Sequence, residues 1–170
     1  MNKKGVSAII GYALLVVFAL IISVGVYAWL KTYIPKEALN CPDGTSILVR
    51  NVTFSQSSRY LNITLENNGR FDVAGYLIHG KNNLSKEVYQ VDLSGYLNQN
   101  STATIFGNSV VLGIIGDNIF SPGEQKTNSF SIPVAVGTIY SVRIIPTRFQ
   151  DEDNRQRFVI CSYSRIKEVI

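Results

Sequence analysis

One stretch of the sequence imitates the spacing of a phosphate-binding loop. In GYLIHGKN, residues 75–82, two glycines are separated by four residues and a lysine follows. A nucleotide-binding loop needs Ser or Thr after that lysine to bind the metal ion, and Asn82 stands there instead. The intervening YLIH is an apolar run typical of a strand, which holds its amides in a sheet ladder instead of presenting them to phosphate. We therefore expect no nucleotide site here.

Other side chains with catalytic or metal-binding chemistry are few and dispersed. His79 is the single histidine, there is no G-x-S-x-G motif, and neither cysteine lies near His79 in the sequence. The acidic run DEDN, residues 151–154, offers oxygen ligands for calcium but lacks the glycine and the distal glutamate of an EF-hand loop. We expect a half-buried strand histidine and a solvated hairpin tip. The sequence thus predicts no catalytic residue, no metal site, no cofactor and no enzyme activity.

The two cysteines are far apart in the sequence. Cys41 follows the N-terminal apolar segment, and Cys161 lies close to the C-terminus. An even count in an exported domain predicts one disulfide bond, with two free buried thiols as the alternative. Metal ligation is disfavoured, because there is no CxxC pair. On the chain-entropy model, a bridge closing so long a loop stabilises a domain by about 4 to 5 kcal/mol.

Four N-x-[ST] sequons follow the apolar segment and none precedes it, at Asn51, Asn62, Asn83 and Asn100. A single sequon occurs often by chance. Four sequons on one side of an export-type segment predict an extracellular domain that carries N-linked glycans.

The element in front of these sites is a long apolar segment. Residues 6–30 contain no charged side chain, and as a helix rising about 1.5 Å per residue they would span about 37 Å, more than the hydrocarbon core of a bilayer at about 30 Å. The apolar region of a cleaved secretory signal is only about 7 to 15 residues long, and no A-x-A site follows this segment. We expect a retained transmembrane helix, with Pro35 marking its end.

Small residues along this helix would permit close packing against other helices. They stand at Ser7, Gly11, Gly25 and Ala28. The alternative is an ordinary signal anchor in which these small residues are incidental.

From Thr45 onward the apolar period changes to two residues. In YLNITLE, Leu61, Ile63 and Leu65 alternate with polar residues, which predicts a strand with one face in a core and Asn62 on the solvent face. Further short runs of this kind lie between turn-rich segments, at 46–55, 71–79, 87–93, 102–115, 127–134, 139–145 and 157–163.

These patterns predict an α+β fold class. A long N-terminal hydrophobic helix is followed by a head of seven or eight strands that form an antiparallel β-sandwich, with an immunoglobulin-like arrangement as one option. Pro133 and Pro146 are expected at strand ends or on edge strands, because proline cannot donate to the ladder.

The net charge of +4 mildly favours anionic surfaces. Basic residues gather toward the C-terminus, at Arg143, Arg148, Arg155, Arg157, Arg165 and Lys167. Alternation along strands should distribute them over two faces, and no recognisable aromatic stacking motif accompanies them. We therefore expect no nucleic-acid partner.

The first residues of the chain form a charged handle in front of the apolar helix. Lys3, Lys4 and Gly5 are followed by Val6, Ser7 and the run AIIGYALLVVFALIISVGVYAW. This order resembles the class III signal peptide and N-terminal helix of archaeal type IV pilins. The resemblance implies that a prepilin peptidase cuts the bond between Gly5 and Val6 and that the two lysines are a discarded cytoplasmic handle. Their removal matters physically, because unpaired charge is costly on a helix that must pack among identical helices.

The resemblance covers about the first 30 residues and implies a β-rich, glycosylated head after them. The fifth residue after the expected cut is Ile10, where bacterial pilins use glutamate, which favours the archaeal branch. Archaellins, the archaeal flagellar filament proteins, share the architecture. The domains expected are a leader at 1–5, a transmembrane and filament-core helix at 6–34, a linker at 35–44 and an extracellular head at 45–170.

The function that this implies is that of a structural subunit of an archaeal type IV pilus-like adhesion filament. Its expected partners are further copies of itself in a helical homopolymer, the prepilin peptidase with the pilus assembly machinery, and the membrane before assembly. Its expected location is the cell surface, reached from a membrane-inserted precursor. The alternative is an uncleaved, membrane-anchored surface protein or archaellum accessory protein with a β-sandwich binding domain.

Overall fold

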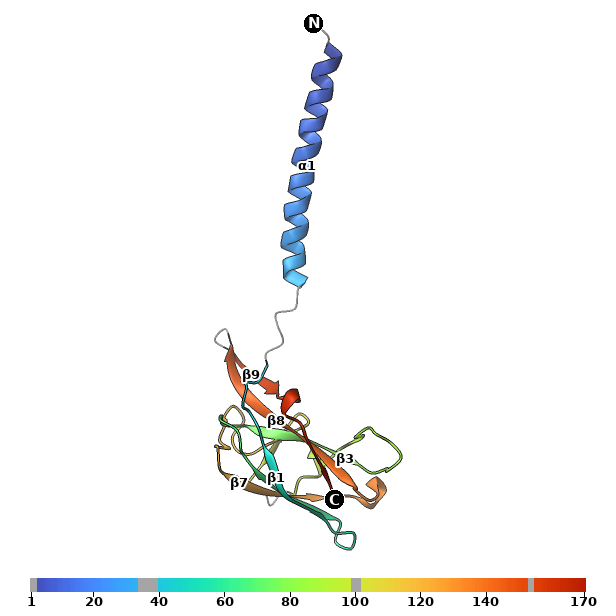
Figure 1. The fold of residues 1–170 in the computed structure, drawn as a ribbon, viewed down its shortest axis with the longest axis vertical. Coiled ribbons are helices and arrows are strands. Elements are labelled where there is room, and N and C mark those ends of the chain that lie inside the picture. The colour runs from blue at the N-terminus through green and yellow to red at the C-terminus, as the bar shows by residue number, and fades with distance from the viewer. Residues whose placement is uncertain (1–2, 34–39, 99–101, 153–154) are drawn as a thin grey trace. The chain divides into compact units, whose positions relative to one another are not determined.

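The chain forms two compact units, Met1–Ala38 and Leu39–Ile170. The computed structural model describes residues 3–33, 40–98, 102–152 and 155–170 (Figure 1). The first unit holds one helix and the second an antiparallel β head, so the predicted α+β class is confirmed. The second unit includes the disulfide bond of Cys41 and the turn before Thr45, which lie in the segment 35–44 that the sequence assigns to a linker.

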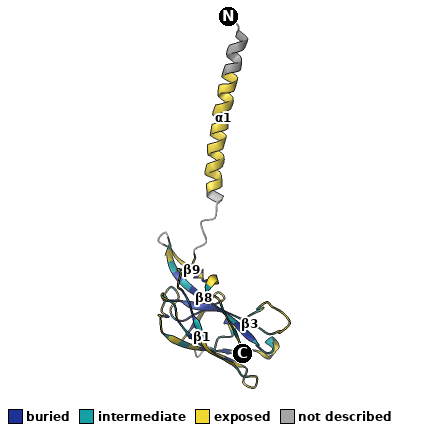
Figure 2. Cartoon of the chain, viewed as in Figure 1, coloured by how far each residue is buried: buried dark blue, intermediate teal, exposed yellow. Residues whose placement is uncertain are grey.

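Helix α1 spans Lys3–Tyr33, so it also includes part of the predicted leader. The side chains of residues 10–31 are exposed along this helix (Figure 2). Its segment Ile10–Lys31 is long and apolar enough to cross a membrane. Lys31 lies in the last turn, where a cation interacts favourably with the helix dipole. The predicted helix end at Pro35 lies outside the described residues.

The smaller sheet of the head has three antiparallel strands in the order β1-β2-β7. Their bounds are Leu48–Phe54 for β1, Tyr60–Glu66 for β2 and Gln125–Ser131 for β7. In β2 the apolar side chains Leu61, Ile63 and Leu65 are fully buried while Asn62 is exposed, as the alternation predicts.

The larger sheet has seven strands built around β3 and β8. One edge of β3 pairs with β8 and the other is shared by β4 and β6, while β5 extends the sheet beyond β6. The free side of β8 is shared by β9 and β10. The bounds are Gly75–Lys81 (β3), Val91–Asp92 (β4), Thr104–Phe106 (β5), Ser109–Val111 (β6), Ser141–Glu152 (β8), Arg155–Ile160 (β9) and Ile166–Val169 (β10). Short 3-10 helices span Ser94–Tyr96 (η1), Val134–Val136 (η2) and Ser162–Ser164 (η3).

The two sheets pack face to face around one main hydrophobic core, which confirms the predicted sandwich. Leu61 and Phe130 of the small sheet belong to the same buried cluster as Tyr76 and Ile144 of the large sheet. The strands divide into three and seven, which differs from the four and three strands of a constant-type immunoglobulin domain. The arrangement therefore shares the layers of that fold and not its strand order.

A second, smaller cluster lies on the outer face of the large sheet. Phe149 and Phe158 are cross-strand partners on β8 and β9 with ring centroids 5.0 Å apart, and Phe106 of β5 packs on both. The Asn118 amide bonds to both the N–H and the C=O of Phe149, each at 2.8 Å. Asn118 thus continues the ladder of β8 beyond the end of β3.

Two predictions about the strands are wrong in detail. The run 102–115 contains two strands, β5 and β6, because Gly107 takes a positive φ of 58° and turns the chain back. Pro146 lies inside β8, not at an end or on an edge, whereas Pro133 does follow a strand end.

Pro146 is tolerated because β8 changes partner from β10 to β9 at this residue. The Pro146 carbonyl accepts the Cys161 N–H at 2.8 Å, so it points away from β3. The N–H and C=O of a strand residue point to the same side, so the N–H that proline lacks would also point toward this junction and not toward β3. The ladder between β8 and β3 loses no hydrogen bond.

Candidate functional site

The predicted processing residues lie on the first turn of α1. Lys3, Lys4, Gly5 and Val6 have helical backbone, and their side chains lie outside the described part of the structure. The first backbone N–H groups of a helix have no partner within the helix, so this first turn opens most easily. The Gly5–Val6 bond lies in this first turn.

The small residues of α1 leave room for another helix. A Cβ atom added at Gly11 or Gly25 would meet no atom within 4 Å. At 100° per residue these two glycines lie within about 40° of one another around the helix axis. Ala28 is exposed one turn beyond Gly25, and the Ser7 side chain lies outside the described residues. Another helix can therefore pack closely against one face of α1 at two positions, Gly11 and Gly25.

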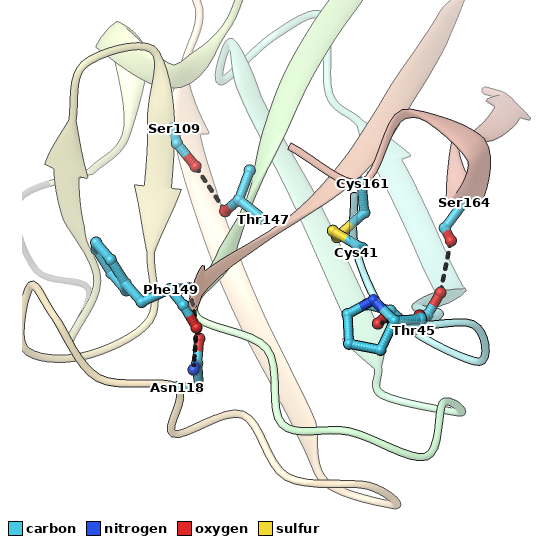
Figure 3. The surroundings of a disulfide bond; sticks show 9 residues. Cys41, Thr45, Ser109, Asn118, Thr147, Phe149, Cys161 and Ser164 are labelled. Carbon is cyan, nitrogen blue, oxygen red and sulfur yellow. Dashed lines mark hydrogen bonds between the residues drawn. A yellow bond between two sulfur atoms is a disulfide. The ribbon is translucent and has the colours of Figure 1, made fainter. Parts of the chain in front are cut away.

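The predicted disulfide bond is confirmed. Cys41 and Cys161 are bonded with their Cα atoms 5.3 Å apart, across a sequence separation of 120 residues (Figure 3). The Ser164 hydroxyl donates to the Thr45 carbonyl at 2.6 Å, and Thr45 donates its own hydroxyl to the Pro42 carbonyl at 2.9 Å. The start of the head is therefore fixed to its last strands by one covalent bond and by hydrogen bonds.

The sequon asparagines that the structure describes are exposed. Asn51 on β1 and Asn62 on β2 face solvent on the small sheet, and their partners in the ladder are Thr64 and Thr53. Each asparagine therefore lies opposite the threonine of the other sequon. Asn83 lies in an exposed turn, where its Oδ1 accepts the Ser85 N–H at 2.9 Å. Asn100 lies outside the described residues. All three described asparagines have space for a glycan.

The phosphate-loop imitation is a strand, as predicted. Residues 75–81 form β3, whose backbone pairs with β8 on one side and with β4 and β6 on the other. His79 is half-buried in this strand, also as predicted. The peptide groups of this stretch are used by the sheet and are not available to phosphate.

The acidic run lies at the hairpin between β8 and β9, which confirms the hairpin. Asp151 pairs with Gln156 and Glu152 with Arg155, while residues 153 and 154 are outside the described ranges. Arg157 forms an ion pair with Glu152 at 2.9 Å. Over the described residues, no group of three or more His, Cys, Asp or Glu side chains is placed to hold a metal ion.

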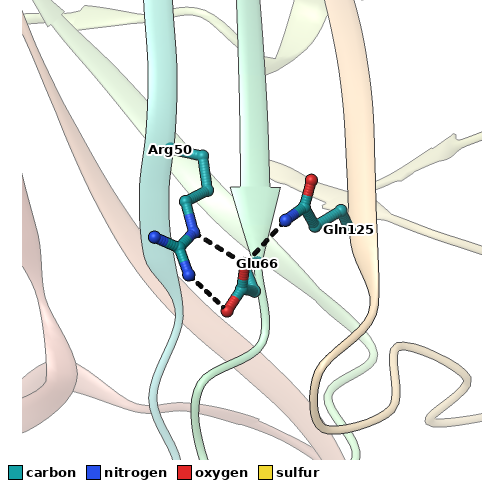
Figure 4. A network of polar contacts seen from close by, with 3 residues as sticks. All are labelled: Arg50, Glu66 and Gln125. Atoms are coloured by element: carbon teal, nitrogen blue, oxygen red, sulfur yellow. Dashed lines mark hydrogen bonds and ion pairs between the residues drawn. The ribbon is translucent and has the colours of Figure 1, made fainter.

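A network of three polar side chains ties the strands of the small sheet together on its exposed face. Arg50 on β1 donates to both carboxylate oxygens of Glu66 on β2, at 2.6 and 2.8 Å, and Gln125 on β7 donates to the same carboxylate at 2.7 Å (Figure 4). These hydrogen bonds hold the pKa of Glu66 below its usual value, with the Arg50 bond as the larger cause.

One group of residues was not found from the sequence. Lys81 on β3, Arg143 on β8 and Lys167 on β10 line one open hollow together with Tyr89 and Glu87. The sequence predicts that the C-terminal cations are scattered, and Arg143 and Lys167 instead come together because β8 and β10 pair in register. No signal in the sequence reveals that register.

Comparisons of the chain with protein-family models, with curated proteins and with solved structures find no match.

Proposed function

We propose that the chain is a structural subunit of an archaeal type IV pilus-like surface filament that serves adhesion. The subunits assemble through α1 after the leader at residues 1–5 is removed. The head lies outside the cell and carries N-linked glycans at its sequon asparagines. The partners are other copies of the chain, the prepilin peptidase with the assembly machinery, and the membrane that holds the precursor.

One observation carries this proposal. The helix segment Ile10–Lys31 is 22 residues long, apolar enough to cross a membrane, and exposed along its length. Apolar surface in water costs about 25 cal/mol per Å². The helix therefore needs lipid or other copies around it, while the head has a closed core of its own.

Charge and side-chain size decide what the helix can pack against. Residues 6–30 carry no charged side chain, so removal of Lys3 and Lys4 takes two cations off the front of the helix and leaves the new α-amino group of Val6 as the charge there. Gly11 and Gly25 allow a neighbouring helix to approach closely, and such contacts replace lipid contacts in a bundle. Helix packing among copies is thus the arrangement that covers the surface.

The test is the N-terminus of the native protein. Intact mass and N-terminal sequencing of material from the cell surface should start at Val6, and electron microscopy should show filaments that contain the chain. Gly5→Trp places a bulky side chain at the expected cut, so we expect the leader to be retained, the protein to stay in the membrane and filaments to be lost.

Asn2→Trp is the matched control, because it places the same side chain in the leader away from the cut bond. It should be processed like the wild type. Native protein that starts at Met1 or Asn2 and remains as single membrane-anchored molecules would contradict the proposal and support a permanent surface anchor. Normal filaments from Gly5→Trp would also contradict it.

A further inference from the structure

The outer face of the large sheet carries basic side chains in direct register across three adjacent strands. His79 on β3 is the cross-strand partner of Arg143 on β8, and Arg143 is the partner of Lys167 on β10. Side chains of directly paired residues point to the same face. Arg143 and Lys167 are both cationic at neutral pH, and like charges directly opposite each other destabilise a sheet. An anion over this row would remove that cost.

The same face is hollowed at this row. The hollow has a volume of about 640 Å³, open to solvent. Its walls are Lys81, Glu87, Val88, Tyr89, Arg143 and Lys167. We call this hollow the basic groove. Three cations face one carboxylate in the groove, whereas residues 39–170 as a whole have 12 Lys and Arg against 11 Asp and Glu. The positive charge is therefore a local property of the groove and not of the head.

The Arg143 side chain is stacked on the Tyr89 ring. Its guanidinium carbon lies 4.2 Å from the centre of the Tyr89 ring, and the Tyr89 hydroxyl accepts a hydrogen bond from Ser141 at 3.2 Å. Its Nε is buried and has no hydrogen-bond partner among the described residues, so a ligand in the open hollow would be bound by the terminal nitrogens of the guanidinium. A stacked, rigid guanidinium is well suited to bind the two oxygens of a carboxylate or sulfate group side by side.

We propose that the basic groove binds an acidic polysaccharide, whose carboxylate or sulfate groups pair with Arg143, Lys167 and Lys81. The hollow is open to solvent, so its walls are accessible to a chain of sugars. Lys81, Arg143 and Lys167 stand on paired strands of one sheet, so their backbones need little reordering on binding.

A second copy of the chain fits the groove less well. Three of the acidic residues described on the head already have basic partners: Glu66 pairs with Arg50, Glu124 with Lys126 and Glu152 with Arg157. The acids at residues 151–152 also lie beside Arg155 on the partner strand. The described head thus offers no unpaired acidic cluster to complement the basic groove.

Nucleic acid also fits less well. Single strands bind to protein surfaces through bases stacked on aromatic rings. Tyr89 is the one aromatic residue among the described walls of the groove, and one face of its ring is covered by Arg143. The groove therefore offers charge without a platform for bases.

The experiment uses the full-length chain in a non-ionic detergent, titrated calorimetrically at low salt with an oligogalacturonate and with its methyl ester. We expect binding of the acid form alone, weakening as salt is added because ions screen the exposed charges. Arg143→Gln and Lys167→Gln should each weaken binding about tenfold or more. Arg155→Gln removes the same charge on β9, opposite Glu152, which lies nine residues along β8 from Arg143, and it should leave binding within about twofold of the wild type because Arg155 does not line the groove.

A thermal melt separates binding from folding. Lys167→Gln removes one member of a like-charge pair, so its melting temperature should equal or exceed that of the wild type. A lower melting temperature would assign Lys167 a structural role and overturn the proposal. Equal weakening by Arg155→Gln, equal binding of the methyl ester, or equal binding of a single-stranded oligonucleotide would also overturn it. The groove belongs to the head alone, so these outcomes are independent of whether filaments form.

Discussion

Tyr76 is buried in the middle of the sandwich with its polar group satisfied. Its side chain is fully buried, and its hydroxyl accepts a hydrogen bond from the Asn128 amide at 2.6 Å. Burial raises the pKa of the Tyr76 phenol, because the charged form would lose its hydration. This pair joins β3 of the large sheet to β7 of the small one, so its hydrogen bond connects the two layers.

Tyr76→Phe should destabilise the head by about 1 to 3 kcal/mol, because the buried Asn128 amide loses its partner. Urea unfolding of the full-length chain in detergent, followed by near-ultraviolet circular dichroism, measures the change. Tyr60→Phe is the matched control, since Tyr60 is 40% exposed, and it should change stability by less than about 0.5 kcal/mol. Equal effects of the two substitutions would contradict the role of the hydrogen bond.

The Arg50–Glu66 pair predicts a loss of stability in acid. The pKa of Glu66 is lower in the folded head than in the unfolded chain, so the pair stabilises the head above the ordinary glutamate pKa of about 4.3. This contribution is lost as the pH falls through the folded pKa, because protonation removes the charge that Arg50 binds. Unfolding measured from pH 6 down to about pH 3 should show a shallower decline for Arg50→Gln than for the wild type. Parallel curves would rule out this contribution.

At the scale of the elements, the contact between β3 and β6 depends on one glycine. A Cβ atom added to Gly75 would lie 1.9 Å from the Val110 carbonyl oxygen, which is backbone and cannot rotate away. Gly75 pairs with Val111 on one side and with Thr147 of β8 on the other, so β3 has no room to shift. The glycine is required by close approach of the strands and not by its own torsion angles.

Gly75→Ala should therefore cost about 1 to 3 kcal/mol or more, the range for overpacking a filled interior. Equilibrium unfolding in urea measures it, together with amide exchange of the β5 and β6 residues, which should become faster as β6 separates from β3. Gly95→Ala is the control, because no atom lies within 4 Å of the added Cβ. Wild-type exchange in β6 of the Gly75→Ala variant would show that the strands adjust without separating.

At the scale of the whole molecule, the chain consists of a β head and an apolar helix. The head has its own core and its own disulfide bond, and residues 10–31 of α1 are exposed. The Cys41–Cys161 bond lies where the chain enters the head, so it ties the entry point to the C-terminal strands. Cys161 lies between β9 and β10. A mechanical force applied to the chain at Cys41 is therefore transmitted through the disulfide bond to these strands as well as along the chain to β1.

Replacing both cysteines by serine should lower the stability of the head by about 2 to 5 kcal/mol, because the unfolded chain then gains the freedom of the opened loop. Urea unfolding with and without a thiol reductant measures the change. The reductant should destabilise the wild type to the level of the double variant and leave the double variant unaffected. If the disulfide bond of the wild type is reduced and its stability in urea does not change, the role assigned to this bond is contradicted.

The sequence alone determined the apolar helix, the strand of Leu61, Ile63 and Leu65, and the pairing of Cys41 with Cys161. The helix and the strand follow from the spacing of apolar residues along the chain, which depends on neighbours within a few positions. The cysteine pair followed from the count of two, which left one bridge to form.

Only the tertiary structure decided which strands pair and in which register. The pairing of β8 with β10 places Arg143 opposite Lys167. The change of partner from β10 to β9 falls at Pro146, and the pairing of β3 with β6 brings Gly75 against Val110. The alternation of a strand fixes which side chains share a face, but the partner opposite each residue is set by packing of segments distant in the chain. The helix could be found from its own residues, whereas the basic groove exists only once three strands lie side by side.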